Sequence, residues 1–164
     1  MKLRRELETV SRQSLAGNGE FRVERLRYRD ISSIAALERL VFSEPMSLGN
    51  LWRHALSDRT AYLVIHRHNT VIAYFGFTFC ERYAHVLANA THPDYRRQGL
   101  AHRLLSEGEQ VARARSARAF IGEVRCSNLV QLKALQAMNW HIAGQMLAFF
   151  GNGENAYVVI KVFD

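Results

Sequence analysis

The segment from Ala84 to Ala112 constrains the fold most, because it predicts a strand, a glycine turn and a helix in immediate succession. Residues 84–90 are typical of a strand, and apolar residues recur at helical spacing from Leu100 onward. The turn between them contains Arg96, Arg97 and Gly99, and glycine lets the backbone approach a ligand closely. The first N–H groups of a helix and its dipole favour an anion. The segment therefore predicts a phosphate-binding turn, and the ligand we expect is a pyrophosphate.

The remaining pattern predicts one α/β domain at residues 21–164, preceded by an extension or arm at residues 1–20. A chain of 164 residues with 48% hydrophobic residues can bury one core. The expected elements are a strand at 21–26, helices at 31–41 and 48–56, strands at 61–66, 70–80 and 84–90, a helix from 100, a strand at 119–125, a helix from 128, and strands at 140–150 and 156–163.

Polar residues predict where the helices and the last hairpin begin and end. Asp30, Ser47 and Asn128 each precede an apolar helical pattern and are N-cap candidates. Asn139 can adopt the left-handed conformation that ends a helix. The sequence Gly-Asn-Gly-Glu-Asn at 151–155 predicts a turn between the last two strands.

The net charge of +7 and the isoelectric point near 9.9 are compatible with a polyanionic partner such as a phosphate-containing cofactor or RNA, and equally with a solvated basic surface. Nucleic acid is not required by this charge. Cys80 and Cys126 lack Cys-x-x-Cys spacing and predict reduced thiols in a cytoplasmic protein. We expect no metal site, since His66 and His68 have no further ligands nearby. We also expect neither a membrane segment nor a signal peptide.

Two motifs carry a resemblance to a known family. Arg96–Ala101 reads Arg-x-x-Gly-x-Ala, which is similar to the (Gln/Arg)-x-x-Gly-x-(Gly/Ala) of the GNAT N-acetyltransferases. Residues 123–128, Glu-Val-Arg-Cys-Ser-Asn, resemble the Glu-Val-Arg-x-Ser-Asn of the RimI branch, the ribosomal-protein-alanine N-acetyltransferases. The resemblance runs from about Phe21 to the end of the chain. It implies the GNAT fold, an α/β fold with a mixed, mostly antiparallel sheet of about seven strands and helices on both faces.

The resemblance implies acetyl-coenzyme A as cosubstrate and a primary amine that attacks it directly in a ternary complex. Backbone N–H groups near Ala90 and Thr91 are expected to polarise the thioester carbonyl. Asn128 is expected to contact the cofactor arm as well as to cap its helix. The full set of expected cofactor-binding residues is Asn89, Ala90, Thr91, Arg96, Arg97, Gln98, Gly99, Leu100, Ala101, His102 and Asn128.

Glu123 is the candidate general base. It lies near the end of its predicted strand, where ligand crevices form in open α/β sheets. Acetyl transfer needs such a base because an amine is mostly protonated at neutral pH. The resemblance implies the same role. The alternative is a structural carboxylate paired with Arg125 or another arginine.

The sequence departs from the RimI-like pattern at Leu135, where those enzymes carry the tyrosine that reprotonates the thiolate, and at Phe149-Phe150, where they carry two tyrosines. The thiolate could leave unaided, since a thiol of pKa near 8.5 is a tolerable leaving group. Another group could donate the proton, or the acceptor could differ from a ribosomal N-terminus. The candidate donors are Cys126, Tyr157, Tyr83 and His92.

The sequence thus predicts an N-acetyltransferase that uses acetyl-coenzyme A, with a protein N-terminus as one acceptor class. The alternatives are an enzyme for a small amine or a lysine side chain, and a non-enzymatic module that binds coenzyme A or RNA. The acceptor, the group that replaces the tyrosine at Leu135 and the oligomeric state are not predicted.

Overall fold

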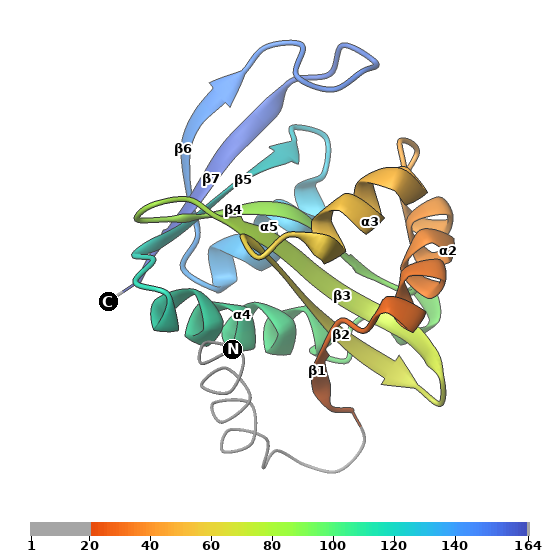
Figure 1. Ribbon diagram of the computed structural model, residues 1–164. Coiled ribbons are helices and arrows are strands. Elements are labelled where there is room, and N and C mark those ends of the chain that lie inside the picture. Colours follow the sequence, from red (N-terminus) through yellow and green to blue (C-terminus); the bar gives the residue numbers. More distant parts are fainter. Residues whose placement is uncertain (1–20, 164) are drawn as a thin grey trace.

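The computed structural model describes residues 21–163 as a seven-stranded sheet with helices on both faces (Figure 1). The strands are β1 (Val23–Arg25), β2 (Thr60–Arg67), β3 (Thr70–Phe79), β4 (Ala84–Thr91), β5 (Ala119–Arg125), β6 (His141–Met146) and β7 (Ala156–Val162). The helices are α2 (Ile31–Val41), α3 (Leu48–Leu56), α4 (Leu100–Ala114) and α5 (Leu129–Ala137), with 3-10 turns η1 (Tyr28–Asp30) and η2 (Pro93–Tyr95). The predicted order of elements is confirmed. The predicted arm at residues 1–20 lies outside the described residues.

The strand order is β1-β2-β3-β4-β5-β7-β6, and the pairing of β4 with β5 is parallel while the other pairings are antiparallel. The predicted mixed, mostly antiparallel sheet is therefore confirmed. The parallel pairing is short, because only Ala84 with Phe120 and His85 with Ile121 are in register. Beyond these two pairs β4 and β5 separate. A gap consequently opens in the middle of the sheet.

Apolar side chains form one core on each face of the sheet. Helices α4 and α5 pack over a cluster that contains Phe75, Phe77 and Phe120. Gly108 lets α4 lie close to the sheet, since a Cβ there would meet the Phe75 ring at 2.5 Å. Helices α2 and α3 cover the opposite face around a cluster that contains Tyr74. In the described chain no helix has both the length and the apolarity to span a membrane.

The predicted helix ends are confirmed at three of four positions. Ser47 Oγ accepts the N–H of Asn50, and Asn128 Oδ1 accepts the N–H of Gln131. Asn139 has φ +63°, so it ends α5 in the left-handed conformation. The prediction for Asp30 is wrong. Its carboxylate does not cap α2, because its oxygens accept the N–H of Arg27 at 2.8 Å and lie 3.0 Å from His66 Nε2.

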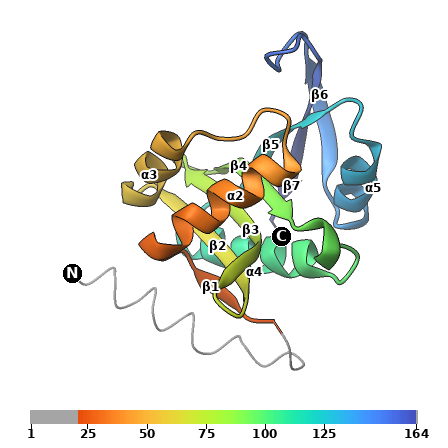
Figure 2. The same cartoon turned by 90° about the vertical axis from the view of Figure 1, so that its right-hand side faces the viewer.

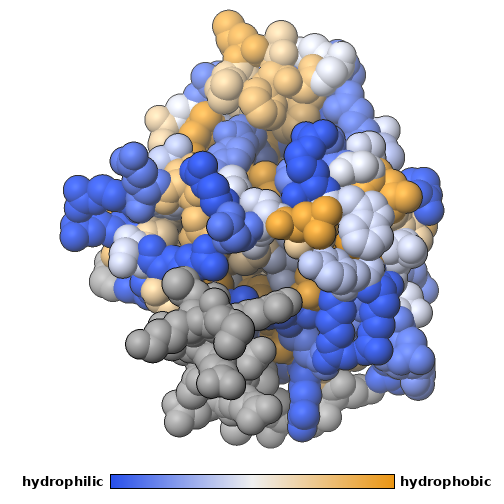
Figure 3. Space-filling view, in the orientation of Figure 1, coloured by the Kyte–Doolittle hydropathy of each residue, from blue (hydrophilic) through white to orange (hydrophobic). Residues whose placement is uncertain are grey.

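The strand predicted to reach Phe150 ends at Met146, which corrects the predicted hairpin. The predicted turn at 151–155 lies within a longer loop of residues 147–155. Asn155 Oδ1 accepts the N–H of Ala148, while Gly153 N–H donates to the Phe150 carbonyl, so local bonds replace the strand ladder. The hairpin of β6 and β7 projects beyond the helices (Figure 2). Its outer end carries exposed apolar side chains, seen as the orange group at the top of Figure 3.

Candidate functional site

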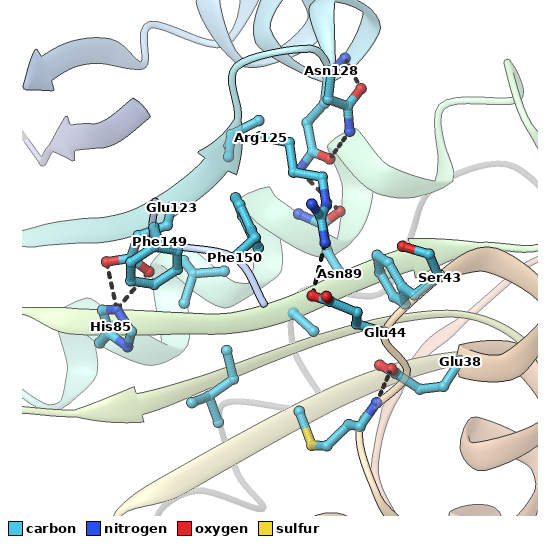
Figure 4. A pocket seen from close by; sticks show the side chains of 17 residues that line it. Glu38, Ser43, Glu44, His85, Asn89, Glu123, Arg125, Asn128, Phe149 and Phe150 are labelled. Atoms are coloured by element: carbon cyan, nitrogen blue, oxygen red, sulfur yellow. Dashed lines mark hydrogen bonds and ion pairs between the residues drawn. The ribbon is translucent and has the colours of Figure 1, made fainter. Parts of the chain in front are cut away.

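A cavity of about 470 Å³ lies where β4 and β5 separate. Its walls come from α2, the loop between α2 and α3, β4, β5, the start of α5 and the β6–β7 loop (Figure 4). The lining residues are Glu38, Phe42, Ser43, Glu44, Met46, His85, Val86, Leu87, Ala88, Asn89, Glu123, Val124, Arg125, Asn128, Gln131, Phe149 and Phe150. The cavity thus combines an apolar wall with ionisable groups.

Glu123 and His85 face each other across the two separating strands (Figure 4). His85 Nε2 lies 2.9 Å from one Glu123 carboxylate oxygen and 3.1 Å from the other. Both side chains are partly accessible, with 17% of Glu123 and 35% of His85 exposed. The hydrogen bond to Glu123 raises the pKa of His85 above its ordinary value, against the opposing effect of burial. Because the carboxylate accepts from Nε2, the neutral imidazole keeps Nδ1 as its proton acceptor.

The edge of β4 carries an irregularity beside this pair. Gly76 and Phe77 of β3 pair with Ala88 and Val86, so Leu87 is the extra residue of a β-bulge. A bulge leaves backbone groups outside the regular ladder. At this point β4 has already separated from β5. Backbone N–H groups at the bulge are therefore candidates to donate to a ligand in the gap.

Arg125 joins three parts of the cavity wall. Its Nη2 lies 2.9 Å from Glu44 Oε2 in the α2–α3 loop, and its Nη1 lies 2.9 Å from Glu154 Oε2 in the β6–β7 loop. Its guanidinium carbon lies 3.9 Å from the centre of the Phe150 ring. Glu154 also accepts from Ser127, and these bonds lower its pKa to about 2. Arg125 therefore fixes the two loops that border the cavity.

Amide side chains line the cavity near α5. Asn128 caps the helix and also donates from Nδ2 to Gln131 Oε1 at 3.2 Å. Gln131 Nε2 in turn lies 3.5 Å from Asn89 Oδ1 on β4. These amides span the gap between β4 and the start of α5. These side chains offer hydrogen-bond donors and acceptors to an extended ligand that itself carries amide groups.

Glu38 and Tyr74 form a buried pair beneath the cavity. The Tyr74 hydroxyl donates to Glu38 Oε1, and Met46 N–H donates to Glu38 Oε2 at 2.7 Å. Burial, followed by the nearby Glu38 carboxylate, raises the pKa of Tyr74 well above its ordinary value. Glu38 itself is 2% exposed. This pair thus anchors the α2–α3 loop from below.

The turn before α4 has the backbone geometry of an anion site. Arg97 has φ +59° and Gly99 has φ +75°, and both lie in the left-handed region. The N–H of Arg103 makes the first bond of α4, to the Gly99 carbonyl. The N–H groups of the three residues before Arg103 therefore point out of the helix end. A turn ahead of a helix end can gather backbone N–H groups around an anion.

The structure brings together three of the predicted site residues, since Asn89, Glu123 and Asn128 all line the cavity. The predicted residues from Arg96 to His102 form the separate turn at the start of α4, where Leu100 is buried at 3% exposure. Ala90 is also buried, at 5% exposure. Glu123 pairs with His85, whereas Arg125 pairs with Glu44 and Glu154, so the Glu123–Arg125 pairing named as an alternative is absent.

Sequence reasoning missed His85, the bulge at Leu87 and the loop contacts of Arg125. The alternating strand pattern of residues 84–91 could have shown that His85 shares a face with Leu87. No local sequence pattern could show that Glu123 lies opposite His85. Residues 21–163 contain no cluster of three or more histidine, cysteine or acidic side chains that could hold a metal ion.

Leu135 lies on the buried face of α5, with 5% exposure. None of the four predicted substitute donors lines the cavity. Cys126 contacts Gln145, and His92 accepts the N–H of Asp94. The other two candidate donors, Tyr83 and Tyr157, also lie outside the cavity lining.

A helix end suited to an anion, a gap between two strands and a carboxylate–imidazole pair beside that gap are the features expected of a group-transfer enzyme for a nucleotide-linked substrate. A family model described as the acetyltransferase (GNAT) family matches residues 29–140, more than half of the 164 residues. The chain therefore belongs to the GNAT acetyltransferase family, whose cosubstrate is acetyl-coenzyme A.

Relatives and solved structures agree with this family. An N-alpha-acetyltransferase of Saccharolobus solfataricus is 24% identical over 155 residues, which cover 87% of this chain and 93% of the relative. The crystal structure of the ribosomal-protein-S18-alanine N-acetyltransferase from Escherichia coli has a TM-score of 0.80 at 19% identity and covers 88% of this chain and 94% of that one. Arabidopsis thaliana NAA60 with a bisubstrate analogue has a TM-score of 0.79 at 13% identity, with 88% and 98% covered. The predicted fold and the N-acetyltransferase prediction are confirmed.

Proposed function

We propose that this chain acetylates the α-amino group of a protein or peptide and that Glu123, with His85, removes the proton from that amine. The observation that carries the proposal is the pair itself, held at 2.9 Å on the wall of a cavity beside the gap between β4 and β5. An imidazole backed by a carboxylate is a competent base near neutral pH.

The predicted cofactor residues fit the parts that acetyl-coenzyme A presents. The turn from Arg96 to His102 would hold the pyrophosphate, and the amides of Asn89 and Asn128 would face the pantetheine arm. Backbone N–H groups at the Leu87 bulge would stabilise the developing oxyanion. This places the polarising groups earlier in β4 than the predicted pair of Ala90 and Thr91.

An α-amine suits this base better than a lysine side chain does. An α-amine has a pKa of about 8, against about 10.4 for lysine, so it is neutral roughly two orders of magnitude more often at pH 7. The named relatives act on protein α-amines: one is an N-alpha-acetyltransferase, and one structure is of a ribosomal-protein-alanine N-acetyltransferase. The unpaired state of Cys80 and Cys126 supports a cytoplasmic setting.

The test is thiol release from acetyl-coenzyme A with three acceptor panels: peptides with free N-termini, the same peptides blocked at the N-terminus but containing lysine, and small amines. We expect turnover on free N-termini and its loss in Glu123→Gln, with coenzyme A binding intact. Arg27→Gln, at an exposed ion pair with Glu24, is the control variant. Equal turnover in the blocked panel would refute the α-amine assignment.

A further inference from the structure

The departing thiolate needs a proton. RimI-like enzymes supply it from a tyrosine, but this chain has a buried leucine at that position. Leu135 lies on the buried face of α5, packs in the core and has no proton to donate. The predicted substitutes sit outside the cavity lining, for example His92 at the η2 turn. The proton source must therefore be sought among the groups that do line the cavity.

Five ionisable residues line the cavity, and three are committed elsewhere. Glu38 is held by the Tyr74 hydroxyl and the backbone of Met46. Glu44 and Arg125 are paired with each other at 2.9 Å, and an arginine does not release its proton in proteins. The remaining two are His85 and Glu123. Of these, a histidine is the group that both accepts and releases a proton near neutral pH.

We propose that His85 carries one proton in both directions, first from the acceptor amine and then to the sulfur of coenzyme A, with Glu123 holding its imidazole. This inference rests on the proposed function and deepens it. Attack of the neutral amine forms the C–N bond, and the carbonyl electron pair moves to oxygen. The nitrogen, now positively charged, gives one proton to His85 Nδ1. The imidazolium is then stabilised by Glu123 through Nε2–H.

Collapse of this adduct returns the same proton. The carbonyl reforms, the C–S bond breaks with its electron pair on sulfur, and Nδ1–H protonates that sulfur. The products are the acetamide and the free thiol, and the pair regains its starting state. Because nitrogen and sulfur are bonded to one carbon in the adduct, a group within reach of one lies close to the other. A separate acid at Leu135 is then unnecessary.

The surroundings of His85 suit this role. Glu123 of β5 is the charged group in hydrogen-bond contact with it. Its antiparallel neighbour on β3 is Thr78, and its parallel neighbour on β5 is Ile121, neither of which titrates near neutral pH. The other charged groups of the cavity are the buried Glu38 on α2 and the paired Glu44 and Arg125 named above.

Chemical rescue tests the proposal. His85→Ala should lower kcat by roughly 10²–10⁴-fold while the Kd for acetyl-coenzyme A stays unchanged. Added imidazole should restore turnover, and a series of substituted imidazoles should restore it to a degree that follows their pKa. His85→Gln, which can still hydrogen-bond to Glu123, should be as slow as His85→Ala. A structural role for His85 predicts instead that Gln restores activity and that imidazole does not.

The matched control is His66→Gln, because His66 forms the same kind of pair, with Asp30 at 3.0 Å, away from the cavity lining. Its kcat should stay near that of the parent, once thermal unfolding shows that the variant is folded at the assay temperature. If His85→Ala keeps the parent kcat on free N-termini, the proton-carrying role of His85 is wrong while the assignment of an α-amine acceptor stands. If the parent itself acetylates no free N-terminus, the proposed function has failed.

The pH dependence of kcat/KM distinguishes a mechanism in which one group is both base and acid from one with a separate base and acid. When a single group takes and returns the proton, kcat/KM rises with pH as that group and the α-amine, whose pKa is about 8, lose their protons, and then stays level to about pH 10. The His85 pKa is raised above 6.5, so the rise should lie above that pH. A falling limb in that range, retained in His85→Gln, would reveal a separate acid and overturn the inference.

Discussion

Arg125 Nη2 lies 2.9 Å from Glu44 Oε2, and this contact ties the end of β5 to a loop 81 residues away in the sequence. The same guanidinium contacts Glu154 and lies over Phe150. The two loops that border the cavity are therefore positioned by one side chain. Under the proposed function the two loops face the acceptor, and the separate turn before α4 holds the pyrophosphate of acetyl-coenzyme A. Acceptor binding and cofactor binding should therefore respond differently to the loss of Arg125.

Arg125→Gln should raise the KM for a peptide acceptor by roughly tenfold, because charge-assisted hydrogen bonds worth about 1.5–3 kcal/mol each are weakened. The Kd for acetyl-coenzyme A should change little. Steady-state kinetics with both substrates and a direct coenzyme A titration measure these effects. Arg27→Gln, which removes an exposed pair with Glu24, serves as the control. An equal loss of coenzyme A affinity would show that Arg125 supports the whole site.

Gly99→Ala should lower the free energy of unfolding by about 1–2 kcal/mol, because its φ of +75° disfavours a residue with a Cβ. The cost is backbone strain alone, since a Cβ there would meet nothing within 4 Å. Gly153 is a matched control: it has φ +82° and equally open space, but lies in the β6–β7 loop.

Both glycine variants should therefore lose similar stability in urea unfolding. Coenzyme A affinity, measured by calorimetric titration, should fall several-fold in Gly99→Ala and remain unchanged in Gly153→Ala. Similar affinities in the two variants would exclude the turn before α4 as the pyrophosphate site.

The turn before α4 shows which parts of the site the sequence can predict. Gly99 and its arginines stand in one short segment, and the caps Ser47 and Asn128 act within three residues of themselves, so local pattern suffices for them. Helical and strand periodicity likewise predicted every element in order. The strand limit at Phe150 was wrong because apolar residues continue past Met146 into a loop that is held by local backbone and side-chain hydrogen bonds.

The missed parts of the site depend on contacts that are distant in the sequence. His85 is one isolated histidine in a strand, and its importance comes from Glu123, 38 residues later. That contact exists only because β4 and β5 are parallel neighbours for two residue pairs and then separate. The Leu87 bulge is set by the register with β3, which no local pattern encodes.

Glu154→Gln should change how stability depends on pH. Hydrogen bonds from Ser127 and then Arg125 hold the pKa of Glu154 at about 2, below its ordinary value of 4.5. The ionised group therefore stabilises the fold above pH 4.5, and this contribution is lost as pH falls from 4.5 toward 2. The Gln variant should be less stable at neutral pH and should lose less stability on acidification.

Urea unfolding at a series of pH values between 7 and the acid limit of folding measures this difference. Glu81→Gln, at an exposed carboxylate, is the comparison, and its stability curve should run parallel to that of the parent. Parallel curves for Glu154→Gln and the parent would show that the bonds of Glu154 do not contribute to stability.

Leu135→Tyr should not raise turnover, although it installs a phenol where RimI-like enzymes carry one. Leu135 is 5% exposed and packs in the same cluster as Leu132 and Trp140, so the larger ring must displace its neighbours. Such overpacking costs about 1–3 kcal/mol, and a buried hydroxyl without a partner adds to that cost. Urea unfolding should show this loss, with kcat at or below the parent value. The decisive variant is Leu135→Tyr combined with His85→Gln: recovery of kcat in that double variant would mean that the phenol reaches the sulfur and that the two positions are interchangeable proton sources.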